Sequence, residues 1–223
     1  TTNGDGTDVL LGGSAAQLPA PASRNVYTCM QDSCKNGVPV SIDLTTLSAN
    51  NLSNLGSLML VGDNTLRDNI IEWLRGVDLR DENDNGDFTD TRHYMGDPLH
   101  SQPSIVTYGV SDANPDLVIY AATNEGLLHA LDDTGTELWS FIPAELLDNL
   151  QTLYDGGVSA GTHPYGLDGQ LTTYEATVSG VVKKFLIAGM RRGGQSYYTF
   201  DITDKNNPRL AFIISSSATI ATG

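Results

Sequence analysis

The chain has 223 residues, of which 39% are hydrophobic and 17% are charged, so it can bury a core and is not generically disordered. Its formal net charge of −15 would repel a phosphate backbone, which argues against nucleic-acid binding. The acidity fits a solvated surface, a cation site or both.

The first residues carry neither the basic head nor the apolar run of a signal peptide. No stretch approaches the roughly 20 apolar residues that cross a bilayer. Both ends of the sequence look cut, so we expect a fragment of a longer chain. If that protein is exported, its export signal belongs to the longer precursor.

The sequence before residue 65 gives only weak signals of secondary structure, and a clear helix pattern follows. Residues 1–25 are rich in Gly, Ala, Thr and Pro, which favours a linker or a surface arm. Short strands are predicted at 24–29 and 38–44. A helix is predicted over 65–75, with Asn64 or Thr65 as its cap and Gly76 at its end, because its apolar residues share one face. These apolar residues are Leu66, Ile70, Trp73 and Leu74.

From residue 101 the pattern changes to short apolar runs separated by turn residues, which is typical of antiparallel strands. Four strands are predicted at 104–108, 117–122, 127–131 and 137–142. A short helix follows Pro143, and then a Gly-rich loop spans 156–166. Four more strands are predicted at 171–178, 182–190, 196–201 and 209–214.

The two strand sets align with each other, Ala130-Leu131-Asp132 falling on Thr199-Phe200-Asp201. Repeated four-stranded units of this size build β-propellers. Two units do not close a ring of about 4–8 blades, so the chain is either a slice of a propeller or a sandwich of two sheets. We favour the slice, and therefore a mainly β chain with about two four-stranded antiparallel blades after a small mixed α/β region.

Residues 123–143 resemble a blade of the quinoprotein-like propeller superfamily through Ala130, Asp132, Thr134, Gly135 and Trp139. Asp132 can accept hydrogen bonds from turn amides, and Gly135 suits the positive φ of a tight hairpin. Trp139 offers a large face for packing one blade on the next. The segment between Asp132 and Thr134 is one residue shorter than the usual repeat.

A narrower resemblance is to the PilY family of type IV pilus proteins. It rests on WLRGVD at 73–78, RHYMGDPLHSQPSIVTYG at 92–109, HPYGLDG at 163–169 and KFLIAGMRRGGQSYYTFDIT at 184–203. The resemblance covers about 65–223. It implies a secreted, calcium-binding surface protein of the pilus tip, acting in pilus biogenesis and adhesion rather than in catalysis. The implied partners are pilins or minor pilins and a host or abiotic surface.

The segment at 81–90, DENDNGDFTD, resembles a calcium loop with oxygen ligands at alternating positions. The candidate ligands are Asp81, Asn83, Asn85, Asp87 through its carbonyl, Thr89 and Asp90. Gly86 would make the sharp turn. Arg92 stands where a bidentate Glu is usual, so Asp90, Asp78, another carboxylate or water must replace that ligand. The alternative is a polar loop that joins the helix to the propeller.

These signals divide the chain into three parts: 1–76 as linker and mixed α/β region, 77–96 as the calcium-loop junction, and 97–223 as the incomplete propeller, with blades at about 101–142 and 167–214. Cys29 and Cys34 exclude a four-thiolate zinc site and, in an exported protein, predict a small disulfide loop.

A zinc site and the rival functions have little support in the sequence. His93, His100, His129 and His163 lack zinc-ligand spacing, and we expect His100 and His129 to be structural. The rival functions are a quinone-dependent dehydrogenase, which shares the blade repeat, and an outer-membrane assembly scaffold. The adjacent cysteine pair of the quinone enzymes is absent, because Cys29 and Cys34 are not neighbours.

Overall fold

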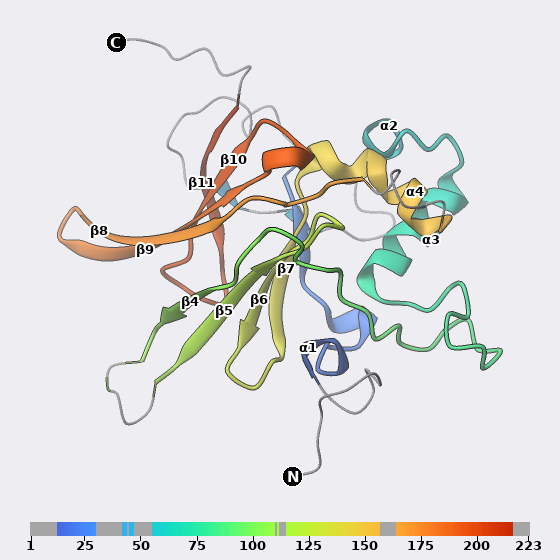
Figure 1. The fold of residues 1–223 in the computed structure, drawn as a ribbon, viewed down its shortest axis with the longest axis horizontal. Helices are drawn as coiled ribbons and strands as arrows, with labels where there is room; N and C mark the ends of the chain where they lie inside the picture. Colours follow the sequence, from blue (N-terminus) through green and yellow to red (C-terminus); the bar gives the residue numbers. More distant parts are fainter. Residues whose placement is uncertain are drawn as a thin grey trace.

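The protein is mainly β, with two antiparallel four-stranded units at its centre and most of its helices at one end (Figure 1). The computed structural model describes residues 13–29, 42–43, 45–46, 55–109, 111, 115–156 and 164–215. Within these residues, no helix has the length and apolar character needed to cross a membrane.

The first blade contains four strands in sequence order, each antiparallel to the next. Alternation explains the arrangement: in the second strand Val118, Tyr120 and Ala122 are buried, while the residues between them are partly exposed. The four predicted strands are confirmed to within two residues at either end. They are β4 (Ser104–Thr107), β5 (Leu117–Ala122), β6 (Leu128–Asp132) and β7 (Glu137–Phe141).

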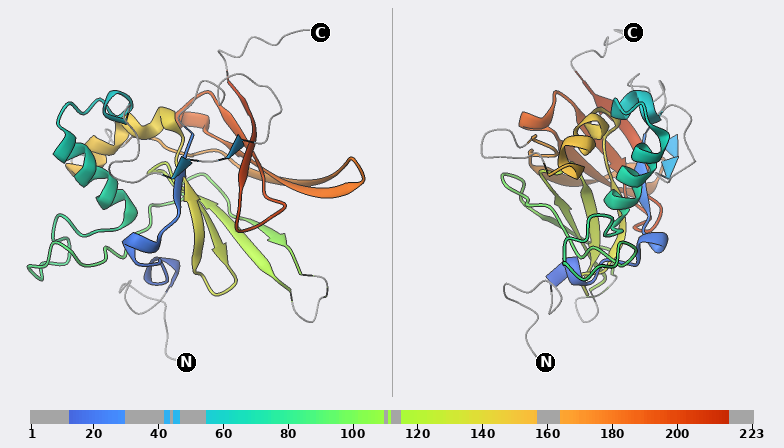
Figure 2. Two further views of the ribbon diagram at one scale, coloured as in Figure 1. Left: turned by 180° about the vertical axis from the view of Figure 1, so that it is seen from behind. Right: turned by 90° about the vertical axis from the view of Figure 1, so that its right-hand side faces the viewer.

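The second blade repeats this order and is also antiparallel throughout. Its predicted strands are confirmed as well, two of them at the predicted bounds. They are β8 (Leu171–Val178), β9 (Val181–Gly189), β10 (Tyr197–Asp201) and β11 (Arg209–Ile214). The outer part of the β8–β9 hairpin projects away from the body, at the end opposite the helices (Figures 1 and 2).

The N-terminal segment adds strands to the outer edges of both blades. Strand β1 (Val26–Thr28) runs parallel to β7 and also pairs with β3 (Thr45–Thr46), while β2 (Ile42–Asp43) pairs with β11. The blades thereby become sheets of six and five strands. The predicted strand at 24–29 is confirmed. Of the one predicted at 38–44, only 42–43 lie among the described residues.

The core between the blades is aromatic. The Trp139 side chain is fully buried, and its ring centroid lies 6.3 Å from that of Phe200 on the other blade. Phe141 lies 4.9 Å from Phe200 and 5.6 Å from Tyr198. The prediction that Trp139 packs one blade on the next is therefore confirmed.

The hairpin turns also follow the sequence. Asp132 Oδ1 accepts hydrogen bonds from the amides of Thr134 and Thr136, both at 2.9 Å, and Gly135 has a φ of 87°. In the second blade Asp201 Oδ1 accepts a bond from the Thr203 amide at 3.0 Å. The predicted correspondence of the two aspartates is therefore visible in their hydrogen bonds.

Helix α3 (Asn64–Arg75) forms where predicted, and Gly76 ends it in the left-handed region with a φ of 106°. The expected cap is wrong by one or two residues, because Asp63 precedes the helix and accepts a bond from the Leu66 amide at 2.8 Å. Ile70, Ile71, Trp73 and Leu74 are buried. The other helices at this end are α2 (Leu55–Met59), the 3-10 helix η4 (Ala144–Asn149) and α4 (Leu150–Tyr154), so the helix predicted after Pro143 is part 3-10.

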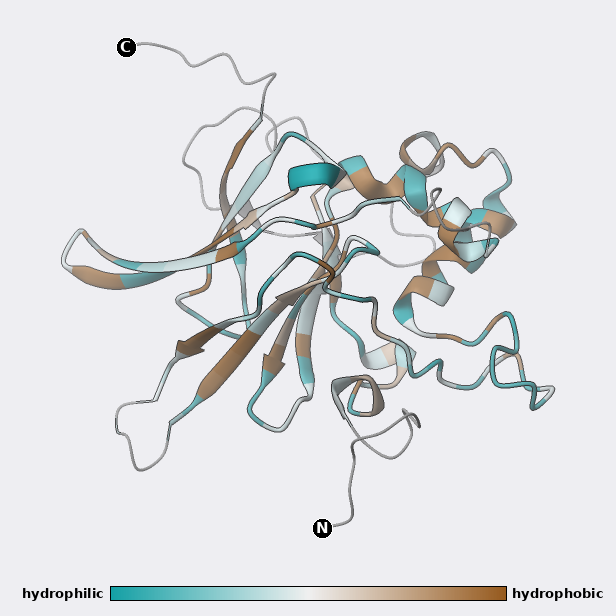
Figure 3. Ribbon diagram, viewed as in Figure 1, coloured by the Kyte–Doolittle hydropathy of each residue, from teal (hydrophilic) through white to brown (hydrophobic). Residues whose placement is uncertain are grey.

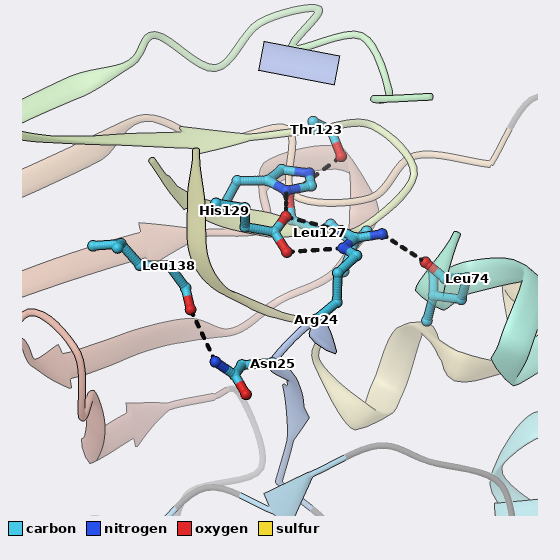
Figure 4. A network of polar contacts seen from close by, with 8 residues as sticks. Arg24, Asn25, Leu74, Thr123, Leu127, His129 and Leu138 are labelled. Carbon is cyan, nitrogen blue, oxygen red and sulfur yellow. Dashed lines mark hydrogen bonds and ion pairs between the residues drawn. The ribbon is translucent and has the colours of Figure 1, made fainter. Parts of the chain in front are cut away.

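Residues 13–25, expected as a linker or surface arm, instead pack on the first blade. They hold α1 (Gly13–Ala16) and the 3-10 turn η2 (Pro21–Ser23). Arg24 is 5% exposed and forms two hydrogen bonds, of 2.9 and 2.8 Å, to the buried carboxylate of Glu137, while His129 Nδ1 lies 2.7 Å from the same group. Figure 4 shows Arg24 reaching from the N-terminal segment towards His129 and the Leu74 carbonyl.

Candidate metal loop

The predicted calcium loop joins α3 to the first blade and lies beside α3 (Figure 1). Its two ends are held together as a neck. Val77 forms a β-bridge with Thr91, and the Asp78 amide donates to the Asp90 carbonyl at 3.0 Å. Residues 79–89, between these ends, therefore form a closed loop. Figure 3 shows mostly hydrophilic colour along this connection.

Asp81 begins the loop and organises its turn. Its Oδ1 accepts hydrogen bonds from the amides of Asn85 at 2.8 Å and Gly86 at 3.0 Å. Asp81 and Asp84 have φ values of 52° and 57°, and Gly86 has 80°. Three left-handed residues within positions 81–86 turn the chain sharply, and glycine takes such a φ without strain. The predicted role of Gly86 is confirmed.

The next side chains repeat one contact, in which a side-chain oxygen accepts from the amide two residues later. Asn83 Oδ1 accepts from Asn85 at 3.1 Å, and Asn85 Oδ1 accepts from Asp87 at 2.6 Å. Asp87 Oδ1 accepts from both the hydroxyl and the amide of Thr89, and these bonds lower the pKa of Asp87. A carbonyl oxygen has two lone pairs, so each Asn oxygen retains one for a cation.

Asp90 faces the two asparagines across the loop. Its Oδ2 accepts hydrogen bonds from Asn83 Nδ2 at 3.0 Å and Asn85 Nδ2 at 2.8 Å. Its Oδ1 is buried and has no hydrogen-bond partner. A buried acceptor without a partner is costly, and a cation beside it would remove that cost. The donor set, all oxygen, is the kind that calcium takes.

The structure thus brings all six predicted ligand residues into one hydrogen-bonded loop. Asp78, an alternative ligand, is 1% exposed and accepts the Glu82 amide at 2.9 Å, so it supports the neck. Among the described residues no three or more His, Cys, Asp or Glu side chains converge on one position. A cation here would depend on the Asn, Thr and backbone oxygens as well.

Sequence reasoning missed the contacts that hold this loop to the protein. Glu82 Oε1 accepts from Trp73 Nε1 at 3.1 Å, and its Oε2 accepts from Arg92 Nε at 2.8 Å. The Arg92 guanidinium lies 4.1 Å from the ring centroids of both Trp73 and Tyr94. Spacing gave no signal for these contacts, because Glu82 occupies a position between the expected ligands.

Two further predictions concern other polar residues. His100 Nδ1 lies 2.6 Å from the buried Asp168 carboxylate, which joins the stretches at 92–109 and 163–169. Cys29 is 6% exposed, and Cys34 lies outside the described residues, so their disulfide stays a prediction.

The fold and the loop together define the class of protein: two consecutive blades of a β-propeller, preceded by an acidic loop. Residues 85–217, more than half of the chain, match the family model of the PilY1 β-propeller domain. The chain belongs to this family.

Similar proteins carry related names. A type IV pilus biogenesis factor PilY1 from Pseudomonas aeruginosa is 28% identical over 121 residues, covering 54% of this chain and 10% of that protein. A PilY1 homologue from Xylella fastidiosa is 28% identical over 190 residues, covering 74% of this chain and 15% of that protein. The crystal structure of the C-terminal domain of Pseudomonas aeruginosa PilY1 is 28% identical, with a TM-score of 0.32, over 45% of this chain and 18% of that one.

Proposed function

We propose that this chain is the calcium-binding propeller part of a type IV pilus biogenesis protein, which acts without catalysis at the pilus tip in pilus assembly and adhesion. The family match over residues 85–217 carries the proposal. The relatives that share it are named type IV pilus biogenesis factors. The chain spans only a small part of their length, so the role of the whole protein is inferred from them.

The proposed cation is Ca²⁺, held by Asp81, Asn83, Asn85, Thr89 and Asp90 with the carbonyl of Asp87. The side-chain N–H donors of Asn83 and Asn85 point at the Asp90 carboxylate. They occupy the position beside this carboxylate that a bound cation would take. Bound calcium would supply no reaction chemistry. It would neutralise the repulsion among the loop carboxylates and hold the turn in one conformation.

The proposed partners are pilins or minor pilins and a host or abiotic surface, and the proposed location is the cell exterior at the pilus tip. The acidic surface favours solubility in that setting. The proposed Cys29–Cys34 disulfide would suit an exported protein. Loss of surface pili in a strain carrying loop substitutions in the parent gene, measured in sheared pilus fractions, would support this assignment, and wild-type piliation would contradict it.

Isothermal titration calorimetry tests the calcium proposal. We expect stoichiometric binding to the parent chain and its loss in the double variant Asp81→Ala/Asn85→Ala. The matched control is Asp84→Asn, which removes one charge from the same loop at a position that is not a proposed ligand and keeps a residue tolerant of the left-handed φ. No binding by the parent chain, or equal binding by the double variant, would refute the calcium site.

A further inference from the structure

Glu82 lies inside the metal loop but uses its carboxylate outside it. One oxygen accepts from the indole of Trp73 and the other from the guanidinium of Arg92. Trp73, on α3, is 4% exposed. The Glu82 carboxylate is therefore anchored to groups outside the loop, whereas the neighbouring side chains of Asp81 and Asn83 form hydrogen bonds within the loop.

Arg92 closes the arrangement into a three-way contact, which we call the Glu82 clamp: Trp73, Glu82 and Arg92. The Arg92 guanidinium stacks on the Trp73 ring at 4.1 Å while it pairs with Glu82. A cation on an aromatic face is attracted by the ring, more strongly when water is excluded, and the Arg92 side chain is only 10% exposed. Each member of the clamp thus contacts the other two.

The clamp also connects the loop with the rest of the molecule. The Trp73 ring packs edge-on against Tyr154 of α4, with centroids 5.7 Å apart. Arg92 stacks on Tyr94, and burial together with Glu125, in the turn between β5 and β6, raises the pKa of the Tyr94 hydroxyl. The second residue of the loop is therefore tied, through two side chains, to both the helical layer and the first blade.

We propose that Glu82 is a positioning residue of the metal loop: it binds no cation, and the clamp holds the loop in its binding shape, so calcium binding and the packing of Trp73 are coupled. This inference rests on the calcium site proposed above. An acidic loop without an anchor would have to be ordered when the cation binds, and that entropy cost lowers affinity. Coupling is reciprocal, so bound calcium also stabilises the clamp.

The sharpest test is Arg92→Met, because charge and clamp predict opposite results. Removing a positive charge beside an acidic loop would tighten calcium binding if only electrostatics mattered. Loss of the clamp should instead weaken it, by roughly tenfold (about 1.4 kcal/mol). Glu82→Gln should also weaken binding, and by more than Asp84→Asn, which removes the same charge but no clamp contact. Calorimetry gives the affinities, and circular dichroism without calcium checks that each variant is folded.

Tryptophan fluorescence gives a second readout, because the chain has two tryptophans. In a Trp139→Phe variant, the emission of Trp73 should change when calcium is added to chelator-treated protein. In a Trp73→Phe variant, the emission of Trp139, which is fully buried between the blades, should stay constant. Arg92→Met in the Trp139→Phe background should reduce the Trp73 response.

The outcomes separate the two proposals. One result would overturn the clamp and leave the calcium site standing: the parent chain binds calcium, the emission of Trp73 does not change, and Arg92→Met binds calcium at least as tightly as the parent chain. Absence of calcium binding by the folded parent chain would overturn both. Weakened binding in Arg92→Met together with a Trp73 response would support the coupling.

Discussion

At the scale of single residues, the buried ion pair between Arg24 and Glu137 holds the N-terminal segment on the first blade. The side chains are 3% and 0% exposed, and they lie 113 positions apart in the sequence. Burial alone would raise the pKa of Glu137, but the hydrogen bond from His129 and the charge of Arg24 lower it to about 2. The fold thus holds an ionised carboxylate in its interior by pairing it.

Removing one partner should be costly. We expect Glu137→Gln to lower the free energy of unfolding by about 3–5 kcal/mol, because Arg24 is then left as a buried charge without its counter-charge. Urea denaturation at neutral pH measures this change. The exposed control Asp84→Asn should change the free energy of unfolding by no more than about 0.5 kcal/mol. A change of similar small size for Glu137→Gln would contradict the role assigned to the pair.

The pH dependence of stability follows from the same carboxylate. Its pKa is lower in the folded chain than the ordinary value of 4.5, so its contribution is complete above pH 4.5. That contribution is lost as the pH falls from about 4.5 towards 2, because the unfolded state binds the proton first. Unfolding curves of the parent chain should therefore show a steeper loss of stability over this range than those of Glu137→Gln. Parallel curves would exclude the linkage.

At the scale of elements, hairpin β8–β9 divides into a packed base and a projecting outer part. Leu186 and Ala188 are fully buried at the base, whereas Val178, Val181 and Val182 near the turn are 44%, 56% and 56% exposed. Figure 3 shows hydrophobic colour at this outer end. A two-stranded ribbon without a packed face is marginally stable in water.

Hydrogen exchange and mutation should reveal this difference. Amides of residues 176–183 should exchange much faster than those of 186–188, because the outer part can open without disturbing the core. Leu186→Ala should destabilise the protein by about 2–5 kcal/mol, whereas Val181→Thr should change stability by no more than about 0.5 kcal/mol. Equal protection along the whole hairpin would show that its outer part is packed.

The elements were predictable from sequence to different degrees. The eight blade strands were predicted because alternation and turn residues, such as Asp132 and Gly135, act locally. The parallel pairing of β1 with β7 was not predicted, because it depends on contacts between segments that are distant in the sequence. One such contact is the hydrogen bond from Thr28 Oγ1 to the Ile142 carbonyl, at 2.8 Å.

The candidate site shows the same limit. The loop positions from Asp81 to Asp90 were predictable, because an alternating pattern of oxygen side chains around a glycine is a local signal. The contacts of Glu82 with Trp73 and Arg92 were not, because they need the geometry of α3 and of the loop neck. His100 was expected to be structural, but its partner could not be foreseen, because Asp168 lies 68 positions away.

At the scale of the whole molecule, the N-terminal segment and both blades share one core. Val26 is fully buried on β1 and belongs to the same cluster as Trp73 and Trp139. The described regions should therefore unfold together, in a single cooperative step.

Placing a charge in this core tests that cooperativity. Val26→Asp buries a carboxylate without a partner and should destabilise the protein by about 3 kcal/mol or more. The urea midpoints of Trp73 and Trp139, followed separately in the two single-tryptophan variants, should then fall together. A lower midpoint for only one tryptophan would show that the chain unfolds in independent parts.

The central claim is that the loop from Asp81 to Asp90 is a calcium site held against α3 and the first blade. The most direct test is a crystal structure of the chain grown with calcium. We predict one ion with six to eight oxygen ligands at roughly 2.3–2.6 Å. These ligands should come from Asp81, Asn83, Asn85, Asp87, Thr89 and Asp90, with Glu82 still bonded to Trp73 and Arg92. A loop without an ion at saturating calcium, or an ion coordinated by Glu82, would contradict the account.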